Sequence, residues 1–282
     1  MITSEGKLHL KRYLAGYEPD IGRALAFGVG TAEATLADNS LQYEVGRSPV
    51  NLVAYDFIND QLIFKAVLDE SFDSIIHEVG LYSREDSSAG SFGSRIISSF
   101  DSDTELWMQG GSPASYTTDN TRIGNDSVTV SVGASSSITV SLANIIVDFS
   151  ENSSADEFSF AFFCSDANLE SIVFRFMTDA ANYYDITVPV GSIAAGFNIV
   201  RISKGSAVVT GNPNWGSIEE LQVTSTATSG GTAVLNLEGI RIEDTDTVDT
   251  GYVLVSRVVL DIPFVKVAGR IQEVEFPLGV SI

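Results

Sequence analysis

The chain has 282 residues, of which 44% are hydrophobic, so it is long enough for one large β domain or two ordinary domains with real cores. It carries 16 basic and 37 acidic residues, a formal net charge of −21, and a charge of this sign repels nucleic-acid phosphates and anionic lipid. No apolar run approaches the roughly 20 residues of a membrane span, and the N-terminus lacks a signal-peptide pattern. These features argue against nucleic-acid binding and membrane insertion.

Residues 4–14 form the one helix candidate, with Thr3 or Ser4 as its N-cap. Short strands rich in β-branched and aromatic residues follow, with a hairpin-type turn at residues 59–60. These strands are predicted at residues 40–57, 61–68 and 75–83.

Between them, residues 27–31 read FGVGT. This stretch lacks the third glycine, the following helix and the acidic residue of a dinucleotide-binding turn. We interpret its glycines as permitting a turn or a close approach of backbone. The sequence therefore predicts no nucleotide site here.

A second series of strands occupies residues 95–243, with Gly, Asn, Asp, Ser and Pro in the connections. The clearest segments are 127–132, 136–149, 157–165, 171–177, 183–190, 197–203, 218–227 and 234–242. So many short strands predict a β-sandwich or a jelly roll.

A polar, charged stretch lies at each end of this series, which is typical of the points where one domain is inserted into another. Strands resume at 252–269 and 272–282. A C-terminal piece of about 30 residues is too small to hold a core alone, so we expect it to complete the first sheet. We predict an all-β protein with a discontinuous β-sandwich domain, residues 1–92 together with 250–282. An inserted jelly-roll β-sandwich domain is predicted for residues 93–249.

Few residues suggest metal or nucleophile chemistry. The single cysteine, Cys164, excludes an internal disulfide, and its apolar surroundings predict a buried side chain. The two histidines, His9 and His77, have no second metal-type ligand at a suitable spacing. We therefore predict no catalytic residue and no bound organic cofactor.

Three short motifs follow one another in residues 24–83, and their order resembles that in the N-terminal domains of bacteriophage tail-fibre and related virion proteins. Residues 24–50 carry the FGxG opening and the L..E..R.PV pattern, and residues 76–83 carry E(V/I)GLY. Residues 254–282 resemble the terminal strands of the same module. The resemblance implies docking to other virion proteins and to copies of the chain, with 44–50 and 255–269 as the contact stretches. The alternative is that both stretches belong to the domain's own core.

The inserted block resembles a carbohydrate-binding-module-type jelly roll of the kind appended to glycoside hydrolases and inserted in phage proteins. The resemblance rests on residues 100–111, 122–132, 174–188, 197–203, 211–227 and 234–242. It implies a structural Ca²⁺ held by an early acid and a terminal acid. The matching positions are Asp101 or Asp103, and Glu238, where the family usually has Asp. The alternative is that Glu238 faces solvent.

Glycan binding would use aromatic faces bordered by polar groups. The candidates are Trp107, Tyr116, Tyr183, Tyr184 and Trp215. Family members often use tryptophan at the positions of Trp107 and Trp215 for sandwich packing, so a core role is the favoured interpretation of both. Adjacent Tyr183 and Tyr184 point to opposite faces of a strand, so at most one is exposed.

Three functions fit these features. In the first, the chain is a non-enzymatic virion structural protein, either a capsid decoration or cement protein or a tail or baseplate component. It would be made in a bacterial cytoplasm, dock through the discontinuous domain and display the acidic jelly roll. The second is an adhesin that recognises a host surface glycan. The third is a glycan-degrading enzyme, which would need two carboxylates across a cleft. We expect the first.

Overall fold

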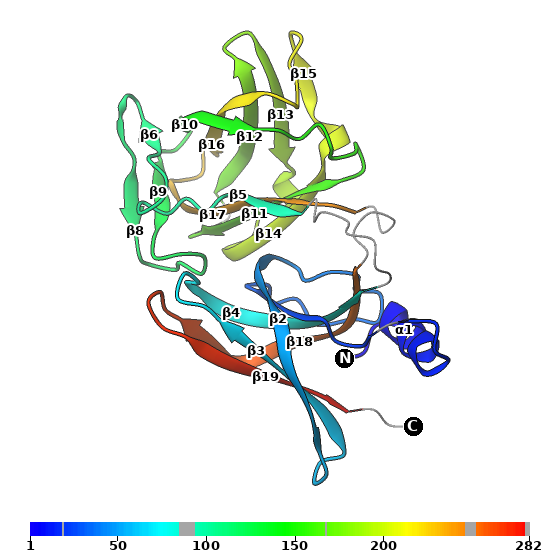
Figure 1. Cartoon of the computed structure of the whole chain (residues 1–282). Helices are drawn as coiled ribbons and strands as arrows, with labels where there is room; N and C mark the ends of the chain where they lie inside the picture. Colours follow the sequence, from blue (N-terminus) through cyan, green and yellow to red (C-terminus); the bar gives the residue numbers. More distant parts are fainter. Residues whose placement is uncertain (19, 85–93, 167, 246–251, 280–282) are drawn as a thin grey trace. The chain divides into compact units, whose positions relative to one another are not determined.

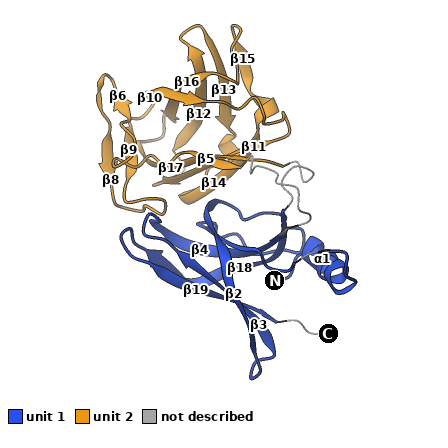
Figure 2. Cartoon of the chain, in the orientation of Figure 1, with its two compact units in different colours: residues 1–91, 247–282 blue, residues 92–246 orange. Residues whose placement is uncertain are grey.

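The computed structural model describes every residue except 19, 85–93, 167, 246–251 and 280–282. The chain divides into two compact units, coloured separately in Figure 2: unit 1, residues 1–91 with 247–282, and unit 2, residues 92–246. Both consist mainly of antiparallel strands, so the predicted all-β class is confirmed. The domain boundaries predicted at 92/93 and 249/250 lie outside the described residues.

The described part of unit 1 contains one helix and one six-stranded sheet (Figure 1). Its elements are α1 (Ser4–Leu14), β1 (Ala24–Gly28), β2 (Glu44–Asp56), β3 (Gln61–Leu68), β4 (Ser74–Arg84), β18 (Tyr252–Lys266) and β19 (Gln272–Gly279). The strand order is β18-β4-β1-β2-β3-β19. The helix begins where predicted, because the Thr3 hydroxyl accepts the N–H of Gly6 at 2.9 Å.

Strand β2 joins the two halves of this sheet. Its first residues pair with β1, and after a register shift at Val50 its remaining residues pair with β3. Side chains from both halves meet in one apolar core. The core consists of Leu25, Phe27, Phe64, Ala66, Leu68, Ile76, Val79, Leu81, Val255, Phe276 and Leu278.

Strands β4 and β18 lie on either side of unit 2 in the sequence and are direct neighbours in the sheet. Tyr252 lies opposite Arg84, and the pairing continues to Lys266 opposite Ser74. The C-terminal residues therefore complete the sheet of unit 1, and the chain leaves that sheet and returns to it at one place.

A buried carboxylate explains why the FGxG and EVGLY motifs occur together. Glu78 of β4 is fully buried, and its oxygens accept N–H groups of Gly30, Gln42 and Tyr43 at 3.0–3.1 Å. A Cβ added at Gly28 would lie 2.5 Å from the Glu78 carboxylate, so only glycine permits this close approach. The glycines thus serve close backbone packing.

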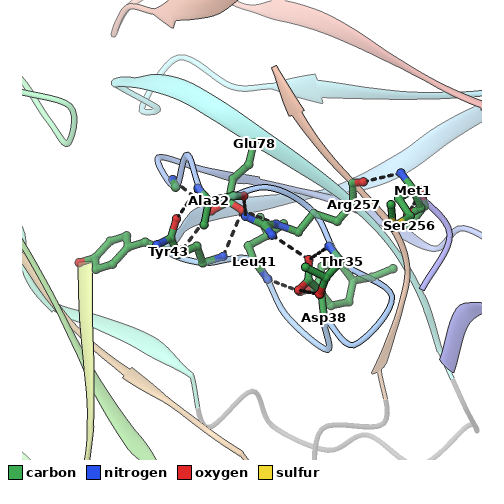
Figure 3. Close-up of polar contacts among 12 residues, drawn as sticks. Met1, Ala32, Thr35, Asp38, Leu41, Tyr43, Glu78, Ser256 and Arg257 are labelled. Carbon is green, nitrogen blue, oxygen red and sulfur yellow. Dashed lines mark hydrogen bonds and ion pairs between the residues drawn. The ribbon is translucent and has the colours of Figure 1, made fainter. Parts of the chain in front are cut away.

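Arg257 of β18 neutralises this carboxylate, as Figure 3 shows. Its Nε donates to Glu78 at 2.7 Å, and its Nη1 donates to Asp38 at 2.7 Å. Its backbone carbonyl accepts the N-terminal amine of Met1 at 2.7 Å, and Nη2 donates to the Ala32 carbonyl at 2.9 Å. One buried network therefore joins the N-terminus, the loop after β1, and the strands before and after unit 2.

Unit 2 is a sandwich of two antiparallel sheets. The seven-stranded sheet has the order β15-β13-β12-β16-β10-β6-β7, and the six-stranded sheet has the order β14-β11-β17-β9-β8 with β5 beside β17. The strands are β5 (Arg95–Ser98), β6 (Met108–Gln109), β7 (Ser112–Pro113), β8 (Ser115–Thr117), β9 (Ser127–Val132), β10 (Ser137–Val147), β11 (Glu157–Cys164), β12 (Leu169–Asp179), β13 (Asn182–Val188), β14 (Gly196–Ser203), β15 (Val208–Thr210), β16 (Ile218–Ala227) and β17 (Ala233–Glu243). Short 3₁₀ turns lie at Val190–Ser192 and Lys204–Ser206.

Aromatic side chains dominate the core between these two sheets. Phe160 stacks on Phe174 across the sandwich at 3.8 Å between ring centroids, and Phe158 packs on Phe176 at 4.5 Å. Cys164 is buried in the same core, as its surroundings predicted. No helix in the described residues is long and apolar enough to cross a membrane.

Candidate functional site

The outer face of the seven-stranded sheet carries a continuous polar row. Side chains alternate along each strand, and Phe174, Phe176 and their neighbours fill the inner face. Strand pairing therefore places four outer residues side by side across the sheet. They are Asp185, Arg175, Gln222 and Ser141.

An ion pair fixes the centre of this polar row. Arg175 donates from Nε to Asp185 Oδ1 at 2.7 Å and from Nη2 to Oδ2 at 2.9 Å. These bonds raise the pKa of the guanidinium. The guanidinium carbon also lies 3.7 Å from the centroid of the Tyr183 ring. The face thus offers rigid donors and acceptors, and the one cation in the row is already paired.

A hollow of about 540 Å³ lies at one end of the same sheet. Its lining combines apolar side chains with three carboxylates and comes from β10, β12, β16 and the residue before β16. The lining residues are Ala143, Asn144, Ile145, Ile146, Met177, Thr178, Asp179, Ser217, Glu219 and Glu220. Strand pairing places Met177 between Tyr183 and Glu220, so the hollow adjoins the polar row.

The two adjacent tyrosines point to opposite faces, as predicted. Tyr184 faces the core, where its ring stacks on Trp215 at 3.8 Å between centroids, and its hydroxyl donates to the Pro213 carbonyl at 2.8 Å. Tyr183 lies half-buried on the outer face beneath Arg175. Only Tyr183 of this pair is placed to meet a ligand on the sheet, and Arg175 covers one side of its ring.

The tryptophans pack inside unit 2. Trp107 is fully buried, stacks on Phe100 at 4.3 Å and donates from Nε1 to Glu105 at 2.8 Å. Burial removes Trp107 from the glycan-binding candidates. Trp215 is partly buried and packs edge-on against Phe149 at 5.8 Å. Both therefore serve sandwich packing, which was the favoured interpretation.

Tyr116 of β8 is half-buried and stabilises the segment before β6 through hydrogen bonds. Its hydroxyl donates to the Glu105 carbonyl at 2.9 Å and accepts the N–H of Trp107 at 3.0 Å. Burial raises the pKa of Tyr116. These bonds hold the segment before β6 and leave Tyr183 as the outward-facing member of the predicted aromatic set.

The proposed calcium ligands approach one loop from two directions. Asp101 Oδ2 accepts the N–H of Asn125 at 2.8 Å, and Asp103 Oδ2 accepts its side-chain amide at 3.1 Å. Glu238 Oε2 accepts the N–H groups of Arg122 and Ile123 at 3.0 and 3.1 Å. Residues 122–125 thus lie between the early and the terminal acid.

Glu238 is fully buried, so the solvent-facing alternative is wrong. Burial raises its pKa to about 7, although the two N–H bonds and the Arg122 charge oppose this shift. Among the described residues its Oε1 has no hydrogen-bond partner. This oxygen fits a cation ligand.

The described chain holds no group of three or more acidic, histidine or cysteine side chains that could bind a metal ion. A Ca²⁺ ion takes 6–8 oxygen ligands. Beyond Glu238 Oε1, the ion would therefore depend on backbone carbonyls and water near residues 122–125.

Unit 1 exposes large apolar side chains on and after α1 (Leu8, Tyr13, Leu14 and Tyr17), at Met1 and Leu36, and at two further surfaces of its sheet. We call the first of these two sheet surfaces, on the end of β2 and the β2–β3 connection, the hairpin tip: Leu52, Val53, Tyr55, Phe57 and Ile58. The second, at the end of β18 and on its connection to β19, is the C-terminal turn: Ile262, Val265, Val267 and Ile271. Phe57 is 86% exposed and Ile58 is 92% exposed, so neither serves the core of its own unit.

These surfaces overlap only partly with the predicted contact stretches. In residues 44–50, Glu44 and Arg47 form a two-bond ion pair at 2.7–3.0 Å, and Arg47 lies over the Tyr82 ring at 4.0 Å. This stretch therefore belongs mainly to the unit's own fold, which was the alternative interpretation. In residues 255–269, Val255 is buried in the core, whereas three apolar residues of the C-terminal turn are exposed.

Sequence reasoning missed the exposure of Phe57 and Ile58, because Phe57 ended the predicted strand 40–57 and Ile58 looks like an ordinary turn neighbour. It also missed Arg175 and Gln222, whose meeting depends on strand register. Both residues lie in predicted strands, but pairing between distant strands cannot be seen in one sequence.

No family model matches the sequence, and no curated protein matches it. Among solved structures, similarity extends to a family 11 carbohydrate-binding module of a Clostridium thermocellum cellulase (TM-score 0.39, 11% identity, 55% of this chain and 96% of that chain). The glycoside hydrolase domain of Endo-D from Streptococcus pneumoniae R6 gives a TM-score of 0.34 at 13% identity, over 50% of this chain and 22% of that one. The enzymatically active domain of bacteriophage CBA120 tailspike protein 4 gives 0.31 at 15% identity, over 52% and 21%.

The chain thus spans about a fifth of the length of the two longer proteins. Similarities of this size do not assign a function to the chain, which has to be argued from its own surfaces.

Proposed function

We propose that the chain is a non-enzymatic structural protein of a bacteriophage particle, which docks through unit 1 and displays unit 2. The observation that carries the proposal is the exposure of large apolar side chains at the hairpin tip and the C-terminal turn. Exposed apolar patches mark surfaces at which proteins associate, because burying them releases water. The phage assignment rests on the tail-fibre-type motifs in residues 24–50 and 76–83.

The geometry of those motifs supports the docking role indirectly. Glu78, Gly30 and Arg47 are engaged within unit 1, by hydrogen bonds or by an ion pair. Such residues maintain a scaffold, while recognition falls to side chains that the scaffold leaves exposed. The hairpin tip and the C-terminal turn are surfaces of that kind.

Unit 2 suits display. Its large aromatic side chains pack mainly in one sandwich core, its exposed apolar residues such as Leu106 and Ile146 are scattered, and the outer face of its seven-stranded sheet is polar along the Arg175 row. The strongly acidic chain also resists nonspecific association with nucleic acid and anionic lipid.

Immunogold electron microscopy with an antibody raised against unit 2 tests the proposal on purified particles of the phage that encodes the chain. We expect gold on intact particles. Labelling over the whole head would favour the decoration or cement role, and labelling confined to the tail would favour the tail or baseplate role. Particles that contain no chain, by labelling and by mass spectrometry, would contradict the proposal.

A second candidate function is glycan recognition by unit 2. The polar row beside the hollow favours it, because sugars are bound by fixed hydrogen-bonding groups next to apolar surface. In this role Gln222 and Asp185 would meet sugar hydroxyls, and Tyr183 and Met177 would meet apolar faces.

Binding of the full chain to a panel of bacterial surface polysaccharides tests this candidate. Gln222→Ala and Tyr183→Ala should weaken saturable binding at least tenfold, and Tyr55→Ala in unit 1 is the matched control. Equal binding by all variants would place the glycan elsewhere. Release of reducing ends during the assay would point instead to a glycan-degrading enzyme.

A further inference from the structure

A buried lysine lies beside the aromatic core of unit 2. Lys204, in the 3₁₀ turn that follows β14, has its Nζ 5.2 Å from the centroid of the Trp215 ring. The amine donates to the backbone carbonyl of Phe149 at 2.9 Å and to that of Asn152 at 2.5 Å. These two bonds use both N–H groups of a neutral lysine amine and leave its lone pair available.

The surroundings of Lys204 favour this neutral form. Phe149, Phe158 and Trp215 pack against one another with ring centroids 5.3–5.8 Å apart, which keeps the region around the amine apolar. Burial lowers the pKa of Lys204, although the charges of nearby carboxylates oppose this shift. A lysine amine that has lost its proton is a nucleophile.

An asparagine whose backbone binds this amine also carries a buried side-chain amide. Asn152 is 5% exposed, its Nδ2 donates to Asp156 Oδ2 at 3.0 Å, and among the described residues its Oδ1 has no hydrogen-bond partner. Asp156 is buried too, and its carboxylate accepts the N–H groups of Ser153 at 3.0 Å and of Thr245 at 3.2 Å. The carboxylate is therefore held in place against the Asn152 amide.

Backbone hydrogen bonds keep the two segments together. The N–H of Lys204 donates to the Asp156 carbonyl at 2.7 Å, and the N–H of Gly205 donates to the Ser154 carbonyl at 2.8 Å. Only Cα and Cβ separate the Asn152 carbonyl group from the side-chain amide carbon Cγ, so Nζ lies within roughly 7 Å of Cγ by standard bond lengths. Rotation of these two side chains is the movement needed to reach the roughly 3–3.5 Å separation from which a bond forms.

We propose that Lys204 and Asn152 form an intramolecular isopeptide bond in folded unit 2. The neutral Nζ attacks Cγ of Asn152, a C–N bond forms to Nζ, and the bond from Cγ to Nδ2 breaks. Asp156 accepts the proton that Nζ loses and passes it to Nδ2, which leaves as ammonia. One amine and one primary amide thus give one secondary amide and ammonia, with no oxidant, reductant or cofactor. The inference goes beyond the proposed function and does not depend on it.

A second buried lysine shows which of these features matter. Lys266 of unit 1 also donates from Nζ to two backbone carbonyls, those of Phe72 and Val267, both at 3.0 Å. Neither of these two residues has a side-chain amide or carboxyl group. Burial and carbonyl contacts alone therefore do not supply the reaction, and Lys266 is a matched control within the same chain.

The isopeptide bond would join the loop between β10 and β11 to the turn after β14, across 52 positions of sequence. A covalent link that closes a long loop restricts the unfolded chain and so stabilises the folded one. Asp156 also binds the N–H and the hydroxyl of Thr245 near the end of unit 2. The link would therefore strengthen the part of unit 2 from which the chain leaves it.

Mass spectrometry of the purified full chain supplies the test. Loss of one ammonia should place the intact mass about 17 Da below the mass calculated from the sequence. After digestion with trypsin, residues 123–175 and 202–241 should appear as one joined peptide that is not cleaved after Lys204. Cleavage after Lys266 in the same digest should proceed normally.

Three variants of the full chain assign the roles. Lys204→Arg keeps a cation that cannot form this amide, Asn152→Ala removes the amide carbon, and Asp156→Asn removes the proton carrier. Each variant should keep its full calculated mass and give no joined peptide, and a cooperative melt shows that it is folded.

Wild-type chain that keeps its full mass and gives separate peptides after a day at pH 8 would overturn the proposal. A gain of about 1 Da on Asn152 would also overturn it, because water would then have attacked the amide in place of Lys204. Loss of ammonia by folded Asp156→Asn would overturn the role assigned to Asp156.

Discussion

The two units treat apolar side chains differently. Unit 2 gathers its large aromatic residues in one sandwich core and presents a polar outer sheet face, with Arg175 at its centre. Unit 1 has a smaller core, places a charged network beside it, and leaves Phe57 and Ile262 almost fully exposed. This difference underlies our proposal that unit 1 associates with a partner and unit 2 is displayed, because exposed apolar patches often mark surfaces at which proteins associate.

The largest expected effect comes from removing the strands that complete unit 1. A chain ending at residue 245 lacks β18 and β19, which exposes the core around Phe64 and leaves Glu78 without Arg257. We expect unit 1 to unfold and residues 92–246 to melt cooperatively, both in this truncated chain and when expressed alone. Calorimetry of the chain that ends at residue 245 and of residues 92–246 alone should give the same unfolding transition for unit 2. Loss or broadening of that transition would contradict the division into units.

The second-largest loss of stability is expected from breaking the buried ion pair between Arg257 and Glu78. Arg257→Ala leaves the Glu78 carboxylate buried and uncompensated, which costs about 3–5 kcal/mol. The matched control is Arg175→Ala, whose partially exposed pair with Asp185 contributes at most about 1 kcal/mol. Denaturant unfolding measures both. Similar losses from the two substitutions would show that the network around Glu78 does not organise unit 1.

Glu238 supplies a pH-dependent prediction for unit 2. Its pKa is raised from 4.5 to about 7 in the folded state, so the folded chain holds this proton more tightly than the unfolded chain does. Its contribution is fully present below pH 4.5 and is lost as pH rises through 7, by up to roughly 3 kcal/mol. In metal-free protein, Glu238→Gln should flatten this part of the stability–pH curve.

Calcium sharpens the same test. A bound cation favours the ionised carboxylate, so added Ca²⁺ should raise the melting temperature at pH 8 by several degrees and leave it unchanged at pH 4.5. A chelator should reverse the shift, and Glu238→Gln should abolish it. A wild-type melting temperature that changes with neither calcium nor chelator at pH 8 would contradict the prediction of a structural calcium ion.

The smallest expected effect concerns the hairpin tip. Phe57→Ala should change the stability of monomeric unit 1 by less than about 0.5 kcal/mol, because the side chain makes no core contact. Phe27→Ala, in the core of the same unit, should cost about 3–5 kcal/mol. A large loss from Phe57→Ala would mean that the tip stabilises its own unit.

Local patterns in the sequence predicted the helix at residues 4–14 and most long strands, since capping and alternation depend on neighbouring residues. They did not reveal β1, because all five of its residues are buried and no alternation marks it. The pairing of Glu78 with Arg257, 179 positions apart, also escaped, since charge partners are set by the fold.

For the candidate sites, residue type was informative and placement was not. Tyr183 and Tyr184 were correctly assigned to opposite faces, but which one faces outward depends on the sandwich. Trp107 was retained as a glycan candidate although it is fully buried. The exposure of Phe57 and Ile58 has no local signature, because a turn beside a strand is buried or exposed according to what surrounds it.

Hydroxyl-radical footprinting of the chain, free and assembled in the particle, tests the central claim most directly. The account predicts strong protection of Phe57, Ile58 and Ile262 on assembly, with Tyr183 and Ile146 equally reactive in both states. Protection of Tyr183 and Ile146 with unchanged reactivity of Phe57 and Ile262 would contradict it, because unit 2 would then be the docking unit.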